Sequence, residues 1–247
     1  MEGYKPYKKD SDYSYSLGAF PTFEAIKKRP DCVREVFCDE SFTEKEKLFD
    51  ECKKRNIPCR VNGKQVKRLS DKENVFVTAI IDKAAYEKKL DETCGLMADK
   101  SHLVLVNPSN MGNMGTILRS CLAFGIHDVA IISPAPDIMN PKVIRSSMGA
   151  IFSLRIKYYD SFDEYRELYQ KHEVFTFMLD GKKPLSAADA PKPELYSLVF
   201  GNEATGLPEE FLHKGTSVII PESPEVDSLN ITIAVGIGLF LFSQGKF

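Results

Sequence analysis

The sequence predicts an α/β protein whose larger part is a mostly parallel sheet, covered by helices on both faces. Two observations predict this fold class. Six continuous apolar runs rich in β-branched residues lie between residues 103 and 220, and helical patterns separate many of them. In such a sheet the ligand site lies beyond the carboxyl ends of the strands.

A smaller α/β unit is predicted to precede this sheet. Its elements, in order, are a helix over 22–29, a strand over 33–37, a helix over 43–56, and strands over 58–61 and 75–81. The second helix opens with the capping-box pattern Thr43-x-x-Glu46. This unit carries no catalytic signature, so we expect it to bind or to pack.

The segment 84–100 is charged, helical in propensity and carries Gly95 late in its length, which is typical of a linker. We therefore predict a small domain with its linker at residues 1–95 and a larger domain at residues 96–247. In the larger domain we expect strands over 103–106, 129–132, 154–158, 174–179, 198–200 and 218–220, and helices over 114–124, 162–171 and 231–242.

The composition excludes several classes of protein. The chain of 247 residues is 43% hydrophobic and 28% charged, which is typical of a globular protein. Its six cysteines form no Cys-x-x-Cys pair and no His stands at zinc-ligand spacing, so we expect reduced thiols, no metal and a cytoplasmic location. The polar start is unlike a secretion signal, and the longest apolar run is far below the roughly 20 residues that span a bilayer.

A net charge of −2 does not by itself indicate a nucleic-acid partner. Three basic clusters nevertheless lie in the first part of the chain: Lys27-Lys28-Arg29, Lys53-Lys54-Arg55 and Lys64 with Lys67-Arg68. Such clusters are more often solvated surface than binding surface, but an RNA-contacting face requires them.

Polar residues gather at the junction between the last predicted strand and the last predicted helix. Asp227 and Ser228 are favoured N-cap residues, so a helix cap is the simple interpretation. Asn230 is predicted to lie inside the first turn, where Asn is a poor helix former and no cap is needed. A second role for its amide, as a ligand, is therefore the alternative.

Two further polar loops follow strands. Residues 107–119 leave one strand and open a helix, with Gly112 and Gly115 at spacings that fit neither a dinucleotide fingerprint nor a P-loop. Residues 200–208 turn between Gly201 and Gly206 and carry a single carboxylate, Glu203.

Taken together, the three loops resemble the three motifs of the SpoU (TrmH-type) RNA 2′-O-ribose methyltransferases of the SPOUT superfamily, over about residues 100–243. The matching patterns are Asn113-x-Gly115-x-x-x-Arg119, Gly201-x-Glu203-x-x-Gly206-Leu207, and Ile220-Pro221 with Ser228-Leu229-Asn230-x-x-x-Ala234. Residues 17–82 also resemble the small RNA-binding domain that precedes the catalytic domain in many members. Asn107 replaces the usual acidic residue of the first motif, and an extra Asn-Met-Gly step leaves open whether Asn110 or Asn113 faces the substrate.

The resemblance implies a site and a cofactor. S-adenosylmethionine would be the cofactor, bound in a C-terminal trefoil knot by Leu179, Gly201, Ile220 and Leu229. The apolar character of three of these residues suits an adenine, and Gly201 suits close approach to a ligand. The residues expected to carry the chemistry are Arg119, Asn113, Glu203, Ser228 and Asn230.

The implied reaction is in-line transfer of the cofactor's methyl group to a ribose 2′-hydroxyl in structured RNA, with ribosomal RNA preferred over transfer RNA. For Arg119 we prefer a phosphate clamp to the base-like role proposed in the family, because a guanidinium stays protonated. The family also implies a homodimer through the catalytic domain. The long apolar C-terminal helix would fit dimer burial or a monomer core equally well.

Two other functions remain open at this stage. A non-catalytic RNA-binding protein that retained the fold would be expected to have lost some of the motif's polar residues, and here all five are present. A nucleotide-dependent oxidoreductase on an ordinary Rossmann sheet would need the glycine fingerprint and a following acidic residue that this sequence lacks.

Overall fold

The structure is a computed structural model that describes residues 3–70, 72–92, 95–186 and 193–244. Contacts between residues divide the chain into two compact units, Met1–Thr93 with Asp137–Ser153, and Cys94–Pro136 with Leu154–Phe247. The short segment 137–153 therefore belongs to the first unit although it lies far from it in sequence. A single boundary between residues 95 and 96 does not anticipate this return of the chain.

The first unit is built on a four-stranded sheet with the order β1-β4-β2-β3. The strands are β1 (Tyr13–Tyr15), β2 (Val33–Cys38), β3 (Cys59–Val61) and β4 (Val77–Asp82). Strands β2 and β3 are parallel, and the other pairs are antiparallel. The three strands predicted in this region are confirmed, whereas β1 was not predicted because three residues give too short a pattern.

The described residues of this unit form the α-helices α1 (Ala19–Lys28), α2 (Lys45–Lys54), α3 (Gly63–Leu69), α4 (Lys83–Glu92) and α6 (Pro141–Ser146), with short 3-10 turns at Pro30–Cys32 and Ala150–Ser153. The capping box predicted at Thr43 is wrong. Helix α2 begins two residues later with Glu44 as its N-cap, and no side chain caps it. Thr43 therefore lies outside the position from which a hydroxyl could reach the first turn.

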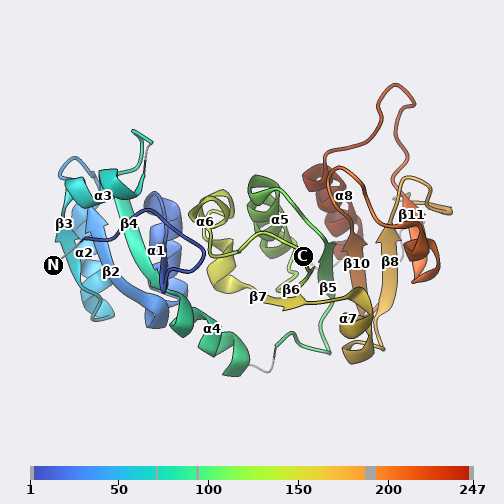
Figure 1. Ribbon diagram of the computed structural model, residues 1–247, viewed down its shortest axis with the longest axis horizontal. Helices are drawn as coiled ribbons and strands as arrows, with labels where there is room; N and C mark the ends of the chain where they lie inside the picture. Colours follow the sequence, from blue (N-terminus) through green and yellow to red (C-terminus); the bar gives the residue numbers. More distant parts are fainter. Residues whose placement is uncertain (1–2, 71, 93–94, 187–192, 245–247) are drawn as a thin grey trace. The chain divides into compact units, whose positions relative to one another are not determined.

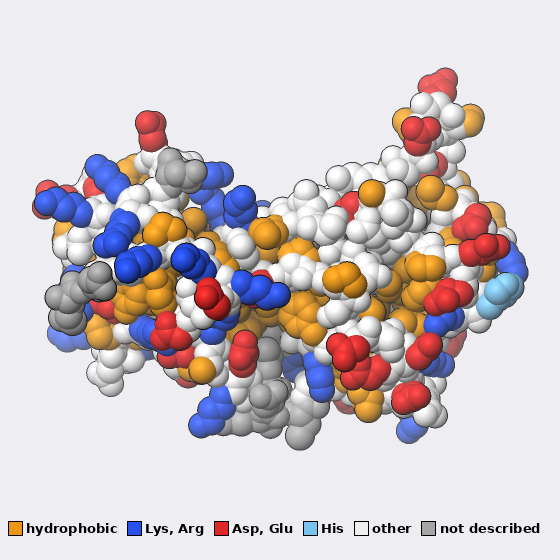
Figure 2. Space-filling model, in the orientation of Figure 1, with side chains coloured by type: hydrophobic (Ala, Val, Ile, Leu, Met, Phe, Trp, Pro, Cys, Tyr) orange, Lys and Arg blue, Asp and Glu red, His pale blue; other side chains and the backbone are white. Residues whose placement is uncertain are grey.

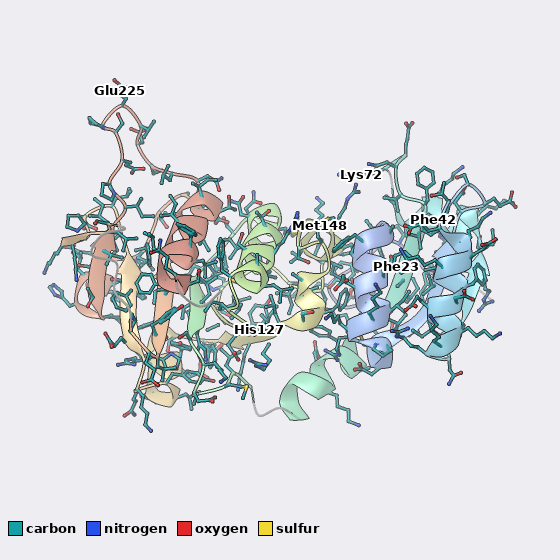
Figure 3. All side chains as sticks on the ribbon, turned by 180° about the vertical axis from the view of Figure 1, so that it is seen from behind. Phe23, Phe42, Lys72, His127, Met148 and Glu225 are labelled. Carbon is teal, nitrogen blue, oxygen red and sulfur yellow. The ribbon has the colours of Figure 1, made fainter. Side chains whose placement is uncertain are left out.

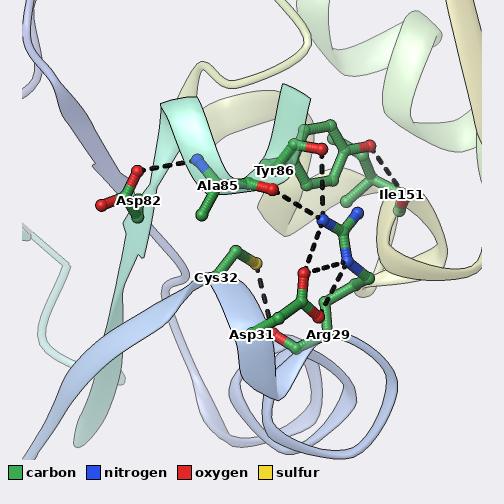
Figure 4. A network of polar contacts seen from close by, with 7 residues as sticks. All are labelled: Arg29, Asp31, Cys32, Asp82, Ala85, Tyr86 and Ile151. Atoms are coloured by element: carbon green, nitrogen blue, oxygen red, sulfur yellow. Dashed lines mark hydrogen bonds and ion pairs between the residues drawn. The ribbon is translucent and has the colours of Figure 1, made fainter. Parts of the chain in front are cut away.

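One of the predicted surface cations is a structural residue (Figure 4). Arg29 is 6% exposed, forms an ion pair of 2.9 Å with Asp31, and donates hydrogen bonds to the carbonyl oxygens of Ala85 and Tyr86. Its guanidinium also lies 4.7 Å from the centre of the Tyr86 ring. Arg29 thus joins α1 to α4, and only Lys27 and Lys28 of that cluster remain exposed.

The second unit contains a seven-stranded sheet in which every recorded strand pair is parallel, with the order β7-β6-β5-β10-β8-β11-β9 (Figure 1). Its strands are β5 (His102–Val106), β6 (Asp128–Ile132), β7 (Arg155–Tyr159), β8 (Glu173–Phe177), β9 (Lys183–Pro184), β10 (Tyr196–Phe200) and β11 (Thr216–Ile219). The six predicted strands and the predicted parallel sheet are confirmed. The two-residue strand β9 was not predicted.

Helices cover both faces of this sheet. They are α5 (Met111–Ala123), α7 (Phe162–Leu168) and α8 (Ile231–Ser243), with a 3-10 turn at Glu209–His213. On strand β8, Val174 packs with the aromatic side chains of α7, whereas the next residue, Phe175, lies 4.8 Å from the ring of Phe242 on α8. Successive side chains of a strand point to opposite faces, so α7 and α8 lie on opposite sides of the sheet.

Among the described residues, no helix has the length and apolar character needed to cross a bilayer. The trefoil knot expected near the C-terminus stays a prediction.

Candidate active site

The loop after β10 closes tightly on itself. The backbone groups of Asn202 and Gly206 exchange two hydrogen bonds, of 3.1 and 2.9 Å, and Gly206 adopts a positive φ of 68° that favours glycine. A Cβ placed on Gly201 would lie 2.2 Å from the carbonyl carbon of Gly206. The missing side chain of Gly201 thus makes room for the loop's own backbone.

This loop directs the Glu203 carboxylate toward the loop that follows β5. The carboxylate accepts hydrogen bonds from the backbone N–H groups of Ser109 (2.9 Å) and Asn110 (3.0 Å) and from the Ser109 hydroxyl (2.7 Å). Partial burial of the carboxyl raises its pKa, but the hydrogen bonds from Ser109 and Asn110 outweigh this effect and hold the pKa of Glu203 below its usual range. Glu203 is therefore ionised and fixed at neutral pH.

The structure gives Asn110 and Asn113 different environments. The Asn110 side-chain oxygen caps α5, because it accepts from the backbone N–H groups of Gly112 (2.8 Å) and Asn113 (3.0 Å). The Asn113 side-chain nitrogen lies 3.4 Å from Glu203 Oε1. The Asn113 side chain thus contacts the loop that carries Glu203, whereas the Asn110 side chain is occupied by capping.

Arg119 lies farther along α5, with an exposed side chain. Within the part of the chain that the structure describes, it makes no recorded hydrogen bond or ion pair. The ordinary structural explanation for a cation on a helix surface, an ion pair with a neighbouring carboxylate, therefore finds no support. Arg119 remains available to an anion outside the chain.

The third loop, between β11 and α8, corrects our prediction of the helix cap. Helix α8 begins at Ile231 and its N-cap is Asn230, whose side-chain oxygen accepts from the backbone N–H (2.8 Å) and hydroxyl (2.7 Å) of Thr232. Neither Asp227 nor Ser228 is the cap, because the helix starts later than the polar pattern suggested. The cap uses only the amide oxygen of Asn230 and leaves its NH₂ group for another partner.

A cavity of about 280 Å³ lies at this edge of the sheet, beyond the carboxyl ends of β8, β10 and β11. All four residues predicted to hold the cofactor line it: Leu179, Gly201, Ile220 and Leu229. Of the residues predicted to carry the chemistry, Glu203 and Ser228 line the cavity, whereas Asn113, Arg119 and Asn230 do not.

The lining also contains residues that sequence reasoning missed. Asp180 and Glu222 are among them, and Asn202 lines the cavity while its side-chain nitrogen donates to the Asn107 carbonyl oxygen (2.8 Å). Together with Glu203, the described residues of the lining include three carboxylates and no Lys, Arg or His. Each of these acids resembles a solvated loop residue in the sequence, and only their common position three residues after a strand end could have indicated the site.

No cluster of metal-ligating side chains occurs among the residues that the structure describes.

Comparison with known proteins places this site in a family. The model of the SpoU rRNA Methylase family matches residues 100–240, more than half of the chain. The chain is 31% identical over 200 residues to a 23S rRNA (adenosine(1067)-2′-O)-methyltransferase of Streptomyces laurentii, covering 78% of this chain and 72% of that protein.

Other relatives are consistent with this match. An uncharacterised tRNA/rRNA methyltransferase of Synechocystis is 33% identical over 141 residues, which cover 56% of this chain and 51% of that protein, so the match spans about half of that relative. The crystal structure of an AdoMet-bound rRNA methyltransferase from Sinorhizobium meliloti superimposes with a TM-score of 0.77 at 22% identity, over 96% of this chain and 88% of that one. This likeness concerns the fold. Its coverage extends over both units, and the family model matches the region of the three loops: the chain belongs to the SpoU rRNA methylase family.

Proposed function

We propose that this protein is an enzyme that transfers a methyl group from S-adenosylmethionine to a ribose 2′-hydroxyl in structured RNA. One observation carries the proposal: three loops that are distant in sequence meet at one edge of the parallel sheet, where Glu203 holds the Ser109–Asn113 segment and where Ser228 and Leu229 line the same cavity. Family membership supports the same reaction.

The cavity fits the cofactor. Its apolar lining, which includes Leu179, Ile220 and Leu229, suits an adenine ring, and its carboxylates suit the positive charge that S-adenosylmethionine carries on sulfur. The bound cofactor would supply a reactive methyl group on a positively charged sulfonium. A dinucleotide carries phosphates instead. Three carboxylates, with no cation among the described lining residues, would repel these phosphates, which disfavours the oxidoreductase alternative.

We assign each side chain a role in cofactor binding, ribose positioning or phosphate binding. Leu179, Gly201, Ile220 and Leu229 hold the cofactor, and Asn113, Glu203, Ser228 and Asn230 position the ribose by hydrogen bonds. Arg119 clamps a phosphate next to the reacting nucleotide. Because a sulfonium is already strongly electrophilic, the main contribution of these residues is alignment of the hydroxyl with the methyl group.

The first unit would supply RNA affinity. Lys64, Lys67 and Arg68 are exposed residues of α3. Figure 2 shows Lys and Arg side chains over much of the visible surface of this unit. Phosphate contacts of this kind give affinity without sequence preference. We propose ribosomal RNA as the substrate, in line with the name of the Streptomyces relative.

The active form is proposed to be a cytoplasmic homodimer. Helix α8 buries Val235 and Leu239 in its own unit, yet Ile233 and Phe240 on the same helix are each 53% exposed. A second copy of the chain that covers this apolar face would explain it. The C-terminal trefoil knot is part of this proposal, and α8 lines the proposed cofactor cavity through Ile231 and Ala234.

Mapping ribose methylation across the total RNA of cells with and without the protein tests this function. We expect one or a few ribosomal nucleotides to lose their 2′-O-methyl group in its absence and to regain it with the wild-type chain but not with Arg119→Ala. An unchanged methylation map would favour the alternative, a non-catalytic RNA-binding protein that retains the fold.

A further inference from the structure

Glu222 differs from the other acids of the cavity in one respect. Its Oε2 atom is buried and has no hydrogen-bond partner among the residues that the structure describes. The Glu203 carboxylate, by contrast, is held by Ser109, Asn110 and Asn113. A buried carboxylate oxygen without a donor is destabilising, so its presence in a cavity wall calls for a partner that is not part of the fold.

Glu222 also differs in exposure from its neighbours on the loop that carries it. It runs from β11 to α8 and extends away from the sheet, with Glu225 at its tip (Figure 3). Residues 223–228 of this loop are exposed, whereas Glu222 is only partly exposed and lines the cavity. Glu222 is thus the acid of this loop that is turned toward the proposed cofactor rather than toward solvent.

We propose that Glu222 binds the α-ammonium group of S-adenosylmethionine and so selects cofactors that retain their amino-acid part. This inference rests on the proposed function. Among the described residues, the lining offers no Lys, Arg or His to neutralise the carboxylate, so a cationic donor complements it better than a neutral hydroxyl does. The ammonium group is the cationic hydrogen-bond donor of this cofactor.

Calorimetric titration of the full chain with two probes tests the assignment. S-adenosylhomocysteine retains the ammonium group, whereas 5′-methylthioadenosine retains the adenine and ribose but lacks the amino-acid part. We expect Glu222→Gln to weaken S-adenosylhomocysteine about tenfold or more, as loss of a charge-assisted hydrogen bond does, and to leave 5′-methylthioadenosine unchanged. Glu225→Gln, a matched change at the exposed tip of the same loop, should alter neither affinity.

Each other result is decisive. Equal weakening of both probes would overturn the assignment, because Glu222 would then serve the ribose or the adenine. Unchanged affinity for both would show that Glu222 does not bind the cofactor. If the wild-type protein binds neither probe, the proposed function itself fails.

Melting temperatures, measured without and then with ligand, give a second test. Since the Glu222 oxygen lacks a partner, the ligand-free Glu222→Gln variant should melt at the wild-type temperature or above it. S-adenosylhomocysteine should then raise the melting temperature of the wild type more than that of the variant. A ligand-free variant that melts below the wild type would indicate a structural role and contradict the proposal.

Discussion

At the residue scale, the site depends on side chains whose positions are fixed before any ligand arrives. Glu203 accepts three hydrogen bonds from Ser109 and Asn110, so the loop after β10 and the loop after β5 form one rigid wall. Because these bonds lower the pKa of Glu203, they stabilise the fold at neutral pH and weaken as the pH falls through that lowered value. Such preorganisation is what alignment of a nucleophile requires.

Arg119 is the residue whose loss should separate catalysis from cofactor binding. Arg119→Ala removes the side chain assigned to the phosphate next to the reacting nucleotide, and Arg119 lies outside the cavity lining. We expect methylation to fall at least about 100-fold, as for loss of a transition-state contact, with unchanged affinity for S-adenosylhomocysteine. Steady-state kinetics and calorimetry measure the two effects. Lys171→Ala, at another exposed cation of the same unit, is the control, and wild-type turnover in Arg119→Ala would refute the role.

Gly201→Ala tests the close packing of the second loop. The new Cβ would lie 2.3 Å from both the Gly206 carbonyl oxygen and the Leu207 nitrogen, so the loop must shift. We expect a loss of about 1–3 kcal/mol in the free energy of unfolding, measured by urea denaturation. Ala204→Ser adds one atom to an exposed residue of the same loop and should stay within about 0.5 kcal/mol of the wild type. Equal stability of the two variants would show that the loop tolerates a side chain at Gly201.

At the scale of elements, the residue at which a helix begins determines which neighbouring polar side chain caps it. Asn110 caps α5 and Asn230 caps α8, each through its side-chain oxygen. Both helices begin at the edge of the sheet where the cavity lies, so the caps hold the helix ends that carry the motif residues. Asn110 and Asn230 are therefore structural in at least part of their role.

Two substitutions separate the helix-capping role of Asn230 from its proposed role in positioning the ribose. Asn230→Ala removes the cap and should cost about 1 kcal/mol in stability. Asn230→Asp keeps a capping oxygen but removes the NH₂ group, so we expect near wild-type melting with reduced methylation. Thermal melts and activity assays on the same preparations distinguish these effects. Full activity in Asn230→Asp would show that Asn230 serves only as a helix cap.

A buried histidine pair near α7 predicts a loss of stability in acid. Burial, with the adjacent His172 ring 4.4 Å away, lowers the pKa of His102 from 6.5 to about 4. The folded state therefore resists protonation that the unfolded state accepts, and stability is full above pH 6.5 and falls as the pH drops toward 4. The expected loss from His102 is roughly 3 kcal/mol at pH 4.

Urea denaturation between pH 7.5 and 4 measures this loss. The His102→Gln variant should show a shallower decline over that interval than the wild type, whatever its stability at pH 7.5. Parallel pH profiles for the two proteins would contradict the assignment to His102.

At the scale of the whole molecule, the exposed face of α8 predicts self-association. Changing Ile233 and Phe240 together to Lys should convert a dimer to a monomer, because it places charges in an apolar interface. Sedimentation velocity reports the mass directly. Leu168→Lys is a matched control, since Leu168 is 57% exposed on α7 and lies outside α8. A monomeric wild-type protein would contradict the dimer.

Across the whole molecule, the sequence predicted some strands and site residues and missed others. The strands of the large sheet were predictable because each is a continuous apolar run, whereas β1 and β9 are too short to give a pattern. The four residues proposed to hold the cofactor, all of which line the cavity, were identified through the motif resemblance. The caps were misassigned because the starts of α2 and α8 depend on tertiary packing, and Glu222 was missed because a lone loop Glu is usually solvated.

Transfer of a labelled methyl group tests the central claim most directly. The purified protein is incubated with methyl-labelled S-adenosylmethionine and ribosomal RNA, and the RNA is digested to nucleosides and separated by mass. We predict label in a 2′-O-methylated nucleoside with the wild-type chain and none with Arg119→Ala. Label on a base, or no label in any nucleoside, would contradict the account.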